Sequence, residues 1–160
     1  MFRKVLVPLD GSDLAERVLP YVEALGRPSS AEIILLQVAP TAASLASLAA
    51  TPAPGVVDFM AVAEKMRGTA TTYLASAAER LSARGLHVRH VVGEGTAAAE
   101  IVRTARELTA ELIAMTTHGR GGIARVVFGS VADEVIRTAP CPIFLVPLRE
   151  AKSSRQGVAA

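Results

Sequence analysis

The chain has 160 residues, a mass of 16.7 kDa, 51% hydrophobic residues and a mean hydropathy of +0.38. A chain of this length can bury roughly 70% of its unfolded surface, so we expect one domain with a substantial core. Lysine and arginine number 17 and aspartate and glutamate 15, and the resulting net charge of +2 is scattered along the chain. Without a concentrated basic patch, a nucleic-acid partner is not expected.

The sequence also bears on the cellular compartment. No apolar run approaches the roughly 18 residues that a membrane span requires. The first residues, MFRKVLVPLD, pass directly into a strand-like segment and lack the layout of a signal peptide. The single cysteine, Cys141, excludes an internal disulfide and a thiolate metal cluster. We therefore expect a cytoplasmic protein with no membrane partner.

Apolar, β-branched runs alternate with amphipathic segments along the chain. The apolar runs predict strands over residues 4–9, 32–38, 86–92, 111–117 and 142–146. Three- and four-residue spacings of apolar side chains predict helices over residues 13–26, 58–84, 96–108 and 130–139. Ser12 or Asp13 is expected to cap the first helix and Thr96 the third. Pro20 removes one backbone hydrogen bond from the first helix and should bend it.

Strands that are apolar throughout and separated by helices are typical of a parallel sheet covered on both faces. The sequence therefore predicts an α/β fold, in which helices sandwich one open five-stranded parallel sheet in a single Rossmann-like domain over residues 1–148. Residues 149–160 are polar and are expected to form a flexible tail. Residues 39–57 carry no charge, and this segment fits either a mobile linker or a lid over a ligand.

The segment THGRGGIARVVFGS, residues 117–130, follows the fourth predicted strand and contains two glycine-marked turns. Ligands of open α/β sheets bind at the carboxyl ends of the strands, where the winding reverses. Gly119 lets backbone N–H groups approach an anion, and Gly129 and Ser130 open a helix with free N–H donors. Spacing alone leaves two interpretations open. One is a phosphate cradle, and the other is a turn at Gly119 followed by a helix cap at Ser130 that Asp133 completes.

Thr116-x-x-Gly119, nine residues, and then Gly129-Ser130 resemble the nucleotide-binding signature of the universal stress protein family. The segments KVLVPLDGS near the start and PCPIFLVP near the end extend the likeness over residues 1 to about 148. The resemblance implies a five-stranded parallel sheet of the adenine nucleotide alpha hydrolase-like type that binds ATP or another adenine nucleotide. The family has glycine where this chain has Thr116, a side chain that either crowds the ligand or hydrogen-bonds to it.

The resemblance also implies a set of nucleotide-binding residues. On the adenine and ribose side they are Pro8, Leu9, Asp10, Val38, Met115 and Thr116. On the phosphate side they are Gly119, Gly129, Ser130 and Val131. Independently of the resemblance, the position of His118 and Arg120 after the fourth strand makes His118 a candidate donor to the phosphates and Arg120 a candidate counter-charge. Val38 is expected to meet the adenine edge through its backbone. Any Mg²⁺ should be held mainly by the phosphates, because no carboxylate cluster is visible. The alternatives are a helix-entry cap for Asp10, a turn residue for His118 and an exposed side chain for Arg120.

We expect a stress-response protein that binds ATP or another adenine nucleotide as a nucleotide-dependent switch or binding module. One alternative is a nucleotide-independent, dimeric interaction or chaperone-like protein with an empty cleft. Another is a slow ATPase or self-phosphorylating enzyme, although no nucleophile stands beside a base and no catalytic residue is predicted. The segment GEGTAA, residues 93–98, formally fits a dinucleotide motif and is the weaker cofactor alternative.

The last predicted strand, within CPIFLVP, lies at the end of the winding and should leave one edge without a partner in the chain. Such an edge invites pairing with another chain. We expect a homodimer in which residues 143–146 pair antiparallel with their own copy about a two-fold axis. A monomer whose tail folds over the edge is the alternative. The sequence does not indicate which protein partner would bind.

Overall fold

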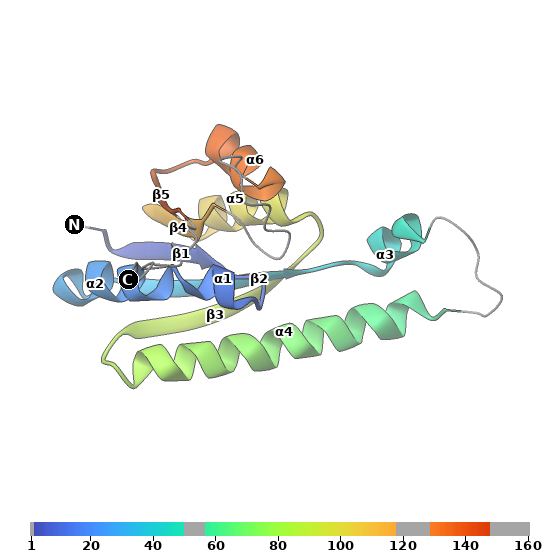
Figure 1. The fold of residues 1–160 in the computed structure, drawn as a ribbon, viewed down its shortest axis with the longest axis horizontal. Helices are drawn as coiled ribbons and strands as arrows, with labels where there is room; N and C mark the ends of the chain where they lie inside the picture. Colours follow the sequence, from blue (N-terminus) through green and yellow to red (C-terminus); the bar gives the residue numbers. More distant parts are fainter. Residues whose placement is uncertain (1, 50–56, 118–128, 148–160) are drawn as a thin grey trace, which may run out of the picture.

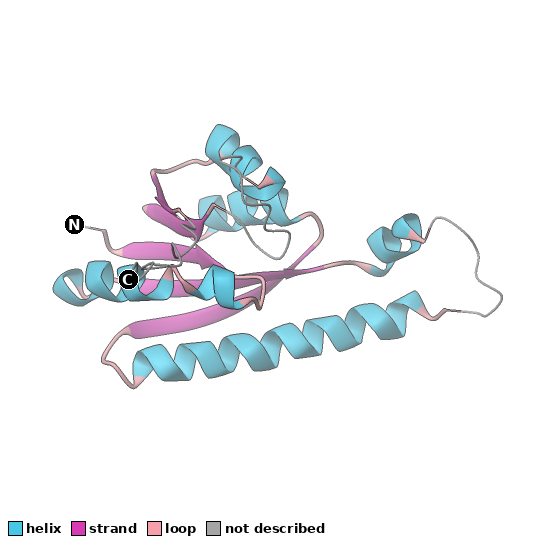
Figure 2. Cartoon of the chain, viewed as in Figure 1, coloured by secondary structure: helices cyan, strands magenta, loops and turns pink. Residues whose placement is uncertain are grey.

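Five parallel strands form one sheet in the order β3-β2-β1-β4-β5 (Figures 1 and 2). The computed structural model describes residues 2–49, 57–117 and 129–147. The strands are β1 (Lys4–Pro8), β2 (Glu32–Ala39), β3 (His87–Glu94), β4 (Leu112–Thr116) and β5 (Ile143–Val146). Each lies within two residues of its predicted bounds, and every pairing in the sheet is parallel. The predicted fold class is confirmed.

Helices cover both faces of this sheet. They are α1 (Asp13–Glu16), α2 (Leu19–Gly26), α3 (Ala42–Leu48), α4 (Phe59–Ser82), α5 (Ala97–Glu107) and α6 (Ser130–Thr138), and a short 3-10 helix, η1 (Arg27–Ser29), follows α2. One core joins α1, α2 and α4 to one face, around Val5, Val7, Ile33 and Leu35. A second core joins α5 and α6 to the other face, around Leu6, Ile34, Leu36 and Ile113. Alternate residues of each central strand thus enter opposite cores, as the pleat of a strand requires.

The predicted first helix is divided into α1 and α2 instead of being bent. Pro20 lies in the first turn of α2, where its missing N–H costs no intrahelical bond. Ser12 caps α1, because its Oγ accepts a hydrogen bond from the backbone N–H of Ala15 at 3.1 Å. Thr96 stands at the cap position of α5, as predicted, but its side chain makes no capping hydrogen bond.

The segment predicted to be a linker or a lid is partly helical. Thr41 caps α3 by accepting a hydrogen bond from the backbone N–H of Ser44 at 3.1 Å. Helix α3 packs on α4, and together with the first turns of α4 it extends past the carboxyl ends of the strands (Figure 1). Residues 50–56 of the segment, and the predicted tail at 149–160, lie outside the described residues. Among the described residues, no helix is both long enough and apolar enough to cross a membrane.

Candidate functional site

Strand β1 is the point where the winding of the sheet reverses. It pairs with β2 on one side and β4 on the other, and the helices that follow β1 and β4 lie on opposite faces. In open α/β sheets, ligands bind in the crevice outside the carboxyl ends of the strands at such a point. Pro8 ends β1, Leu9 is buried beside it, and Asp10 follows at this edge.

Asp10 organises the turn between β1 and α1. Its Oδ1 accepts hydrogen bonds from the backbone N–H of Ser12 at 2.9 Å and from the Ser12 hydroxyl at 2.5 Å. Gly11 between them has φ +79°, a left-handed conformation that favours glycine. The alternative interpretation of Asp10 is thus borne out in part. The carboxylate holds the turn, while Ser12 provides the helix cap.

Strand β2 extends beyond β1 at the same edge. The last residue of β1, Pro8, pairs with Leu36, and β2 continues for three more residues to Ala39. The Leu36 carbonyl accepts a hydrogen bond from Leu9 N–H at 2.8 Å, so the peptide groups of even-numbered β2 residues face β1. The N–H and C=O of Val38 therefore point past the end of β1. Among the described residues, no backbone hydrogen bond joins Val38 to β1 or to the turn that follows it.

The end of β4 lies against the start of α6. The Thr117 carbonyl accepts a hydrogen bond from Gly129 N–H at 2.9 Å, and Thr117 N–H donates to the Val146 carbonyl at 3.1 Å. Met115 and Thr116 are both buried, with 6% of each exposed. Alternation along β4 places Thr116 on the face of Leu112 and Ala114, under α1 and α2. The strand end and the helix start, which eleven residues separate in the sequence, are thus brought together.

Helix α6 does not begin with the serine cap that one interpretation of the sequence predicts. Gly129 is the N-cap, and Ser130 is already the first helical residue, so a Ser130 cap completed by Asp133 is not present. Asp133 instead pairs with Arg137 at 2.7 Å. No side chain caps the helix among the described residues. The first backbone N–H groups, including those of Ser130 and Val131, are therefore available to an acceptor outside the helix.

Two glycines at the end of β3 have structural roles, Gly93 in packing and Gly95 through its positive φ of +125°. A Cβ on Gly93 would lie 2.5 Å from Cγ and 2.6 Å from Oε1 of Glu100, so the buried Glu100 side chain occupies the space beside this backbone. Hydrogen bonding from Arg103 lowers the pKa of Glu100 against the opposing effect of burial. The Gly95 N–H donates to the Ala39 carbonyl at 3.0 Å. This packing accounts for the GEGTAA motif without a dinucleotide.

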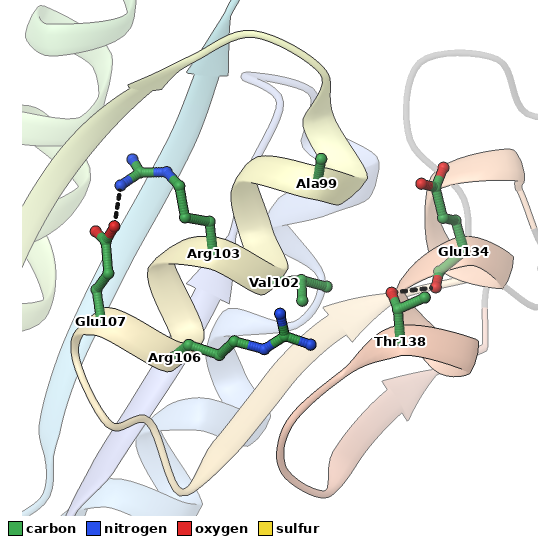
Figure 3. A pocket seen from close by; sticks show the side chains of 7 residues that line it. All are labelled: Ala99, Val102, Arg103, Arg106, Glu107, Glu134 and Thr138. Carbon is green, nitrogen blue, oxygen red and sulfur yellow. Dashed lines mark hydrogen bonds and ion pairs between the residues drawn. The ribbon is translucent and has the colours of Figure 1, made fainter.

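A separate groove of about 520 Å³ runs between α5 and α6 (Figure 3). It is lined by Ala99, Val102, Arg103, Arg106, Glu107, Glu134 and Thr138. None of these residues belongs to the predicted nucleotide site.

Among the described residues, no group of three or more histidine, cysteine, aspartate or glutamate side chains could hold a metal ion. Burial raises the pKa of the Cys141 thiol, which keeps it protonated at neutral pH.

The sequence pattern of the universal stress protein family matches residues 1–147 of the chain. The chain belongs to this family. Universal stress protein Sll1654 of Synechocystis sp. is 30% identical over 147 residues, which cover 92% of this chain and 87% of the relative. Universal stress protein MJ0531 of Methanocaldococcus jannaschii is 27% identical over 146 residues, which cover 91% of this chain and 82% of the relative.

Solved structures of other universal stress proteins share the fold. MJ0577 of Methanocaldococcus jannaschii matches with a TM-score of 0.80 at 24% identity, covering 94% of this chain and 99% of that one. A universal stress protein in complex with cAMP matches with a TM-score of 0.62 at 23% identity, covering 91% of this chain and 96% of that one. The protein from Archaeoglobus fulgidus in complex with dAMP matches with a TM-score of 0.59 at 21% identity, covering 91% of this chain and 97% of that one.

The structure brings most of the predicted site residues of this universal stress protein to one edge of the sheet. Those at the ends of β1, β2 and β4 and at the start of α6 are Pro8, Leu9, Asp10, Val38, Met115, Thr116, Gly129, Ser130 and Val131. His118, Gly119 and Arg120 lie outside the described residues. Two polar residues outside the predicted set, Gln37 and Tyr73, each have a buried side-chain oxygen without a hydrogen-bond partner among the described residues. No motif marks them, since one lies in an apolar strand and the other on an amphipathic helix.

Proposed function

We propose that this universal stress protein binds ATP or another adenine nucleotide at the carboxyl edge of its sheet and acts as a nucleotide-dependent switch or binding module. The observation that carries the proposal is the step at the end of β1, beyond which the N–H and C=O of Val38 point past the end of that strand. An adjacent N–H donor and C=O acceptor complement the N1 acceptor and N6 amino donor of adenine. The structural neighbours bound to cAMP and dAMP support an adenine ligand.

The proposed nucleotide lies across the switch point of the sheet. Asp10 accepts hydrogen bonds from ribose hydroxyls, next to Val38 in the register of the sheet, and Met115 and Thr116 bound the ribose from β4. A carboxylate suits hydroxyl donors, and a hydrogen bond to a charged group is stronger than one between neutral groups.

The phosphates in this proposal point away from the adenine, toward α6. The first N–H groups of α6, from Ser130 and Val131, face them with the positive end of the helix dipole, while the Gly129 N–H is donated to the Thr117 carbonyl and Gly129 contributes only the room left by its missing side chain. His118, Gly119 and Arg120 complete the phosphate side in the proposal. Mg²⁺, where bound, is held chiefly by phosphate oxygens, which fits the lack of a cluster of metal-binding side chains among the described residues. The switch operates in the cytoplasm, as the single cysteine leads us to expect.

Native mass spectrometry of the freshly purified protein tests the function. The proposal predicts bound adenine nucleotide, or its uptake on addition of ATP with Mg²⁺, at one per chain. A protein that carries no nucleotide and takes none up at millimolar ATP would be a nucleotide-independent interaction protein instead. Steady-state phosphate release in the same samples identifies a slow ATPase.

We also propose a homodimer through β5. Within the described residues this edge strand pairs only with β4, and Ile143, Phe144 and Leu145 are only partly buried. Tyr21 of α2, 50% exposed, lies against Phe144 with ring centroids 5.9 Å apart and widens the apolar edge. An isologous pairing of this edge would satisfy its backbone groups and cover both rings.

Light scattering at micromolar concentration tests the dimer. We expect a mass near twice 16.7 kDa for the wild type, and near 16.7 kDa for Phe144→Asp, because the charge would be buried in the interface. Met60→Asp is a matched control, since Met60 is 72% exposed in the first turn of α4. Helix α4 begins at the end of the molecule away from β5 (Figure 1), so this variant should stay dimeric. A wild-type mass near that of one chain would rule the dimer out.

A further inference from the structure

Two buried side-chain oxygens, Oε1 of Gln37 and the hydroxyl of Tyr73, have no hydrogen-bond partner within the part of the chain that the structure describes. They are the only such side-chain atoms found there. Folded proteins pair almost all buried polar groups, and one that is left unpaired costs about 1–3 kcal/mol. A leucine at 37 and a phenylalanine at 73 would avoid that cost. The described residues do not complete the hydrogen bonds of these two groups, so both are open to a partner beyond them.

Both side chains lie on the face of the sheet that α4 covers. Tyr73 packs against the core formed there by Ile33, Leu35 and their neighbours. Gln37 follows these two residues at the strand period of two and so shares their face. In the register with β1, Gln37 lies opposite Leu9, the residue before Asp10. This places Gln37 one step below the Val38 peptide group of the proposed adenine contact.

Gln37 and Tyr73 also lie at similar positions along the direction of the strands. Helix α4 runs antiparallel to β2 (Figure 1), and Leu86, whose N–H donates to the Leu81 carbonyl, lies beside Ile33. Tyr73 precedes Leu81 by eight residues, which is about 12 Å along a helix. Gln37 follows Ile33 by four residues, which is about 13 Å along a strand. Both therefore stand near the carboxyl edge, on one side of the cleft.

The charges around Tyr73 indicate what kind of partner would fit. The Glu16 carboxylate is held by Arg80 at 2.9 Å and lies near the Tyr73 hydroxyl. Burial raises the pKa of Tyr73 above its ordinary value, and Glu16 raises it further because its carboxylate lies close to the hydroxyl, although outside the geometry of a full hydrogen bond. The charge of Asp10 adds to this effect, so the hydroxyl remains a proton donor at neutral pH. The two carboxylates disfavour a phosphate here, and the nearby cation is already paired. A neutral group with its own donors and acceptors fits best.

We propose that Gln37 and Tyr73 are specificity-determining residues of the nucleotide site, which hydrogen-bond to the nucleoside part of the ligand from the α4 side of Asp10. The Gln37 oxygen accepts from an amino or hydroxyl group of the nucleoside, and the Tyr73 hydroxyl donates to one of its acceptors. The inference rests on the proposed function and adds to it two residues that recognise the nucleoside. These residues are separate from the start of α6, which binds the phosphates in the proposed function. The polar pair is retained at a cost in stability because it completes its hydrogen bonds only when the ligand is bound.

Calorimetric titration with adenosine and with ATP tests this assignment, using the full-length wild type, Tyr73→Phe and Gln37→Leu. We expect each substitution to weaken both ligands by the same factor, about fivefold, which is the usual net value of one neutral hydrogen bond. The melting temperature of each ligand-free variant should equal or exceed that of the wild type, because an unpartnered polar group has been removed from the interior. Tyr21→Phe is the matched control at the other tyrosine, and it should change neither quantity.

Three results would overturn the inference while leaving the proposed function intact. One is wild-type affinity in both folded variants. The second is a lower melting temperature with unchanged affinity, which would show that the two groups serve the fold alone. The third is a loss confined to ATP, which would place them at the phosphates. If the wild type binds neither adenosine nor ATP, the proposed function itself fails.

Discussion

The nucleoside half and the phosphate half of the proposed site are built from different kinds of structure. The nucleoside half consists of strand ends, where β1 stops opposite Leu36 and leaves the Val38 peptide group pointing past the end of β1, on the side of Asp10. The phosphate half consists of a helix start, where Gly129 caps α6 and is held by the Thr117 carbonyl. Strand ends fix directed hydrogen bonds to a particular base, whereas a helix start offers a diffuse positive field to any anion. We therefore expect the first half to set specificity and the second to set affinity for the phosphate chain.

The largest effect should come from Asp10→Ala. It removes a charged acceptor from the ribose, and hydrogen bonds to charged groups contribute about 1.5–3 kcal/mol. We expect about thirtyfold weaker calorimetric binding of both adenosine and ATP. Asp13→Ala, an exposed carboxylate in the first turn of α1, is the control and should bind as the wild type does. If Asp10→Ala and the wild type bind adenosine and ATP with equal affinity, Asp10 does not contact the ribose.

Gly129→Val should separate the two halves. The branched side chain at the cap of α6 would enter the phosphate volume and cost at least about tenfold in ATP affinity, or about 1.4 kcal/mol. Adenosine carries no phosphate, so its affinity should stay within about twofold of wild type. Unchanged ATP binding by a folded Gly129→Val protein would contradict the placement of the phosphates at α6.

A smaller effect is expected from Val38→Pro. Proline removes the N–H that faces the cleft, while the hydrogen bonds between β2 and β3 use the peptide groups of the neighbouring residues, including the carbonyl of Ala39. We expect adenosine and ATP to bind about fivefold more weakly, as for the loss of one neutral hydrogen bond. Val38→Ala keeps the N–H and should retain most of the affinity. If the two variants bind equally well, Val38 does not act through its backbone.

The smallest effect on binding should come from Glu100, which packs at the end of β3 outside both halves. Its pKa is lowered in the folded protein by Arg103, so its contribution to stability is present above its ordinary pKa of 4.5 and is lost as the pH falls through the lowered value. Glu100→Gln should therefore unfold with a weaker pH dependence below about pH 4.5 and bind ATP as the wild type does. Glu107→Gln, at an exposed partner of the same arginine, is the control. If the stability of Glu100→Gln depends on pH below about pH 4.5 as strongly as that of the wild type, this assignment is contradicted.

Most of the fold could be predicted because buried parallel strands are continuous apolar runs. The division of the first helix was not predicted, since the pattern shows a helical face on both sides of Pro20 and does not show that the chain restarts there. Helix α3 was missed because alanine, serine and threonine give little contrast between its faces. Its one sequence signal is Thr41 placed to cap it.

The candidate site could be predicted only where a motif marks it. Asp10 and the Gly129-Ser130 pair stand in recognisable segments, and the structure places both at the carboxyl edge. The exposure of the Val38 peptide group depends on the different lengths of β1 and β2, which only the register reveals. Gln37 and Tyr73 come from separate elements, and their shared position depends on how α4 crosses the sheet.

Amide chemical shifts during titration of isotope-labelled protein with ATP and Mg²⁺ test whether an adenine nucleotide binds at the carboxyl edge of the sheet. We expect a saturable shift of the Val38 amide at one equivalent per chain, because its N–H gains a hydrogen bond to the base. The amides of Ser130 and Val131 should shift in parallel, and adenosine alone should move Val38 but leave the start of α6 nearly unchanged. A Val38 amide that stays in place at saturating ATP would contradict binding of an adenine nucleotide at this edge of the sheet.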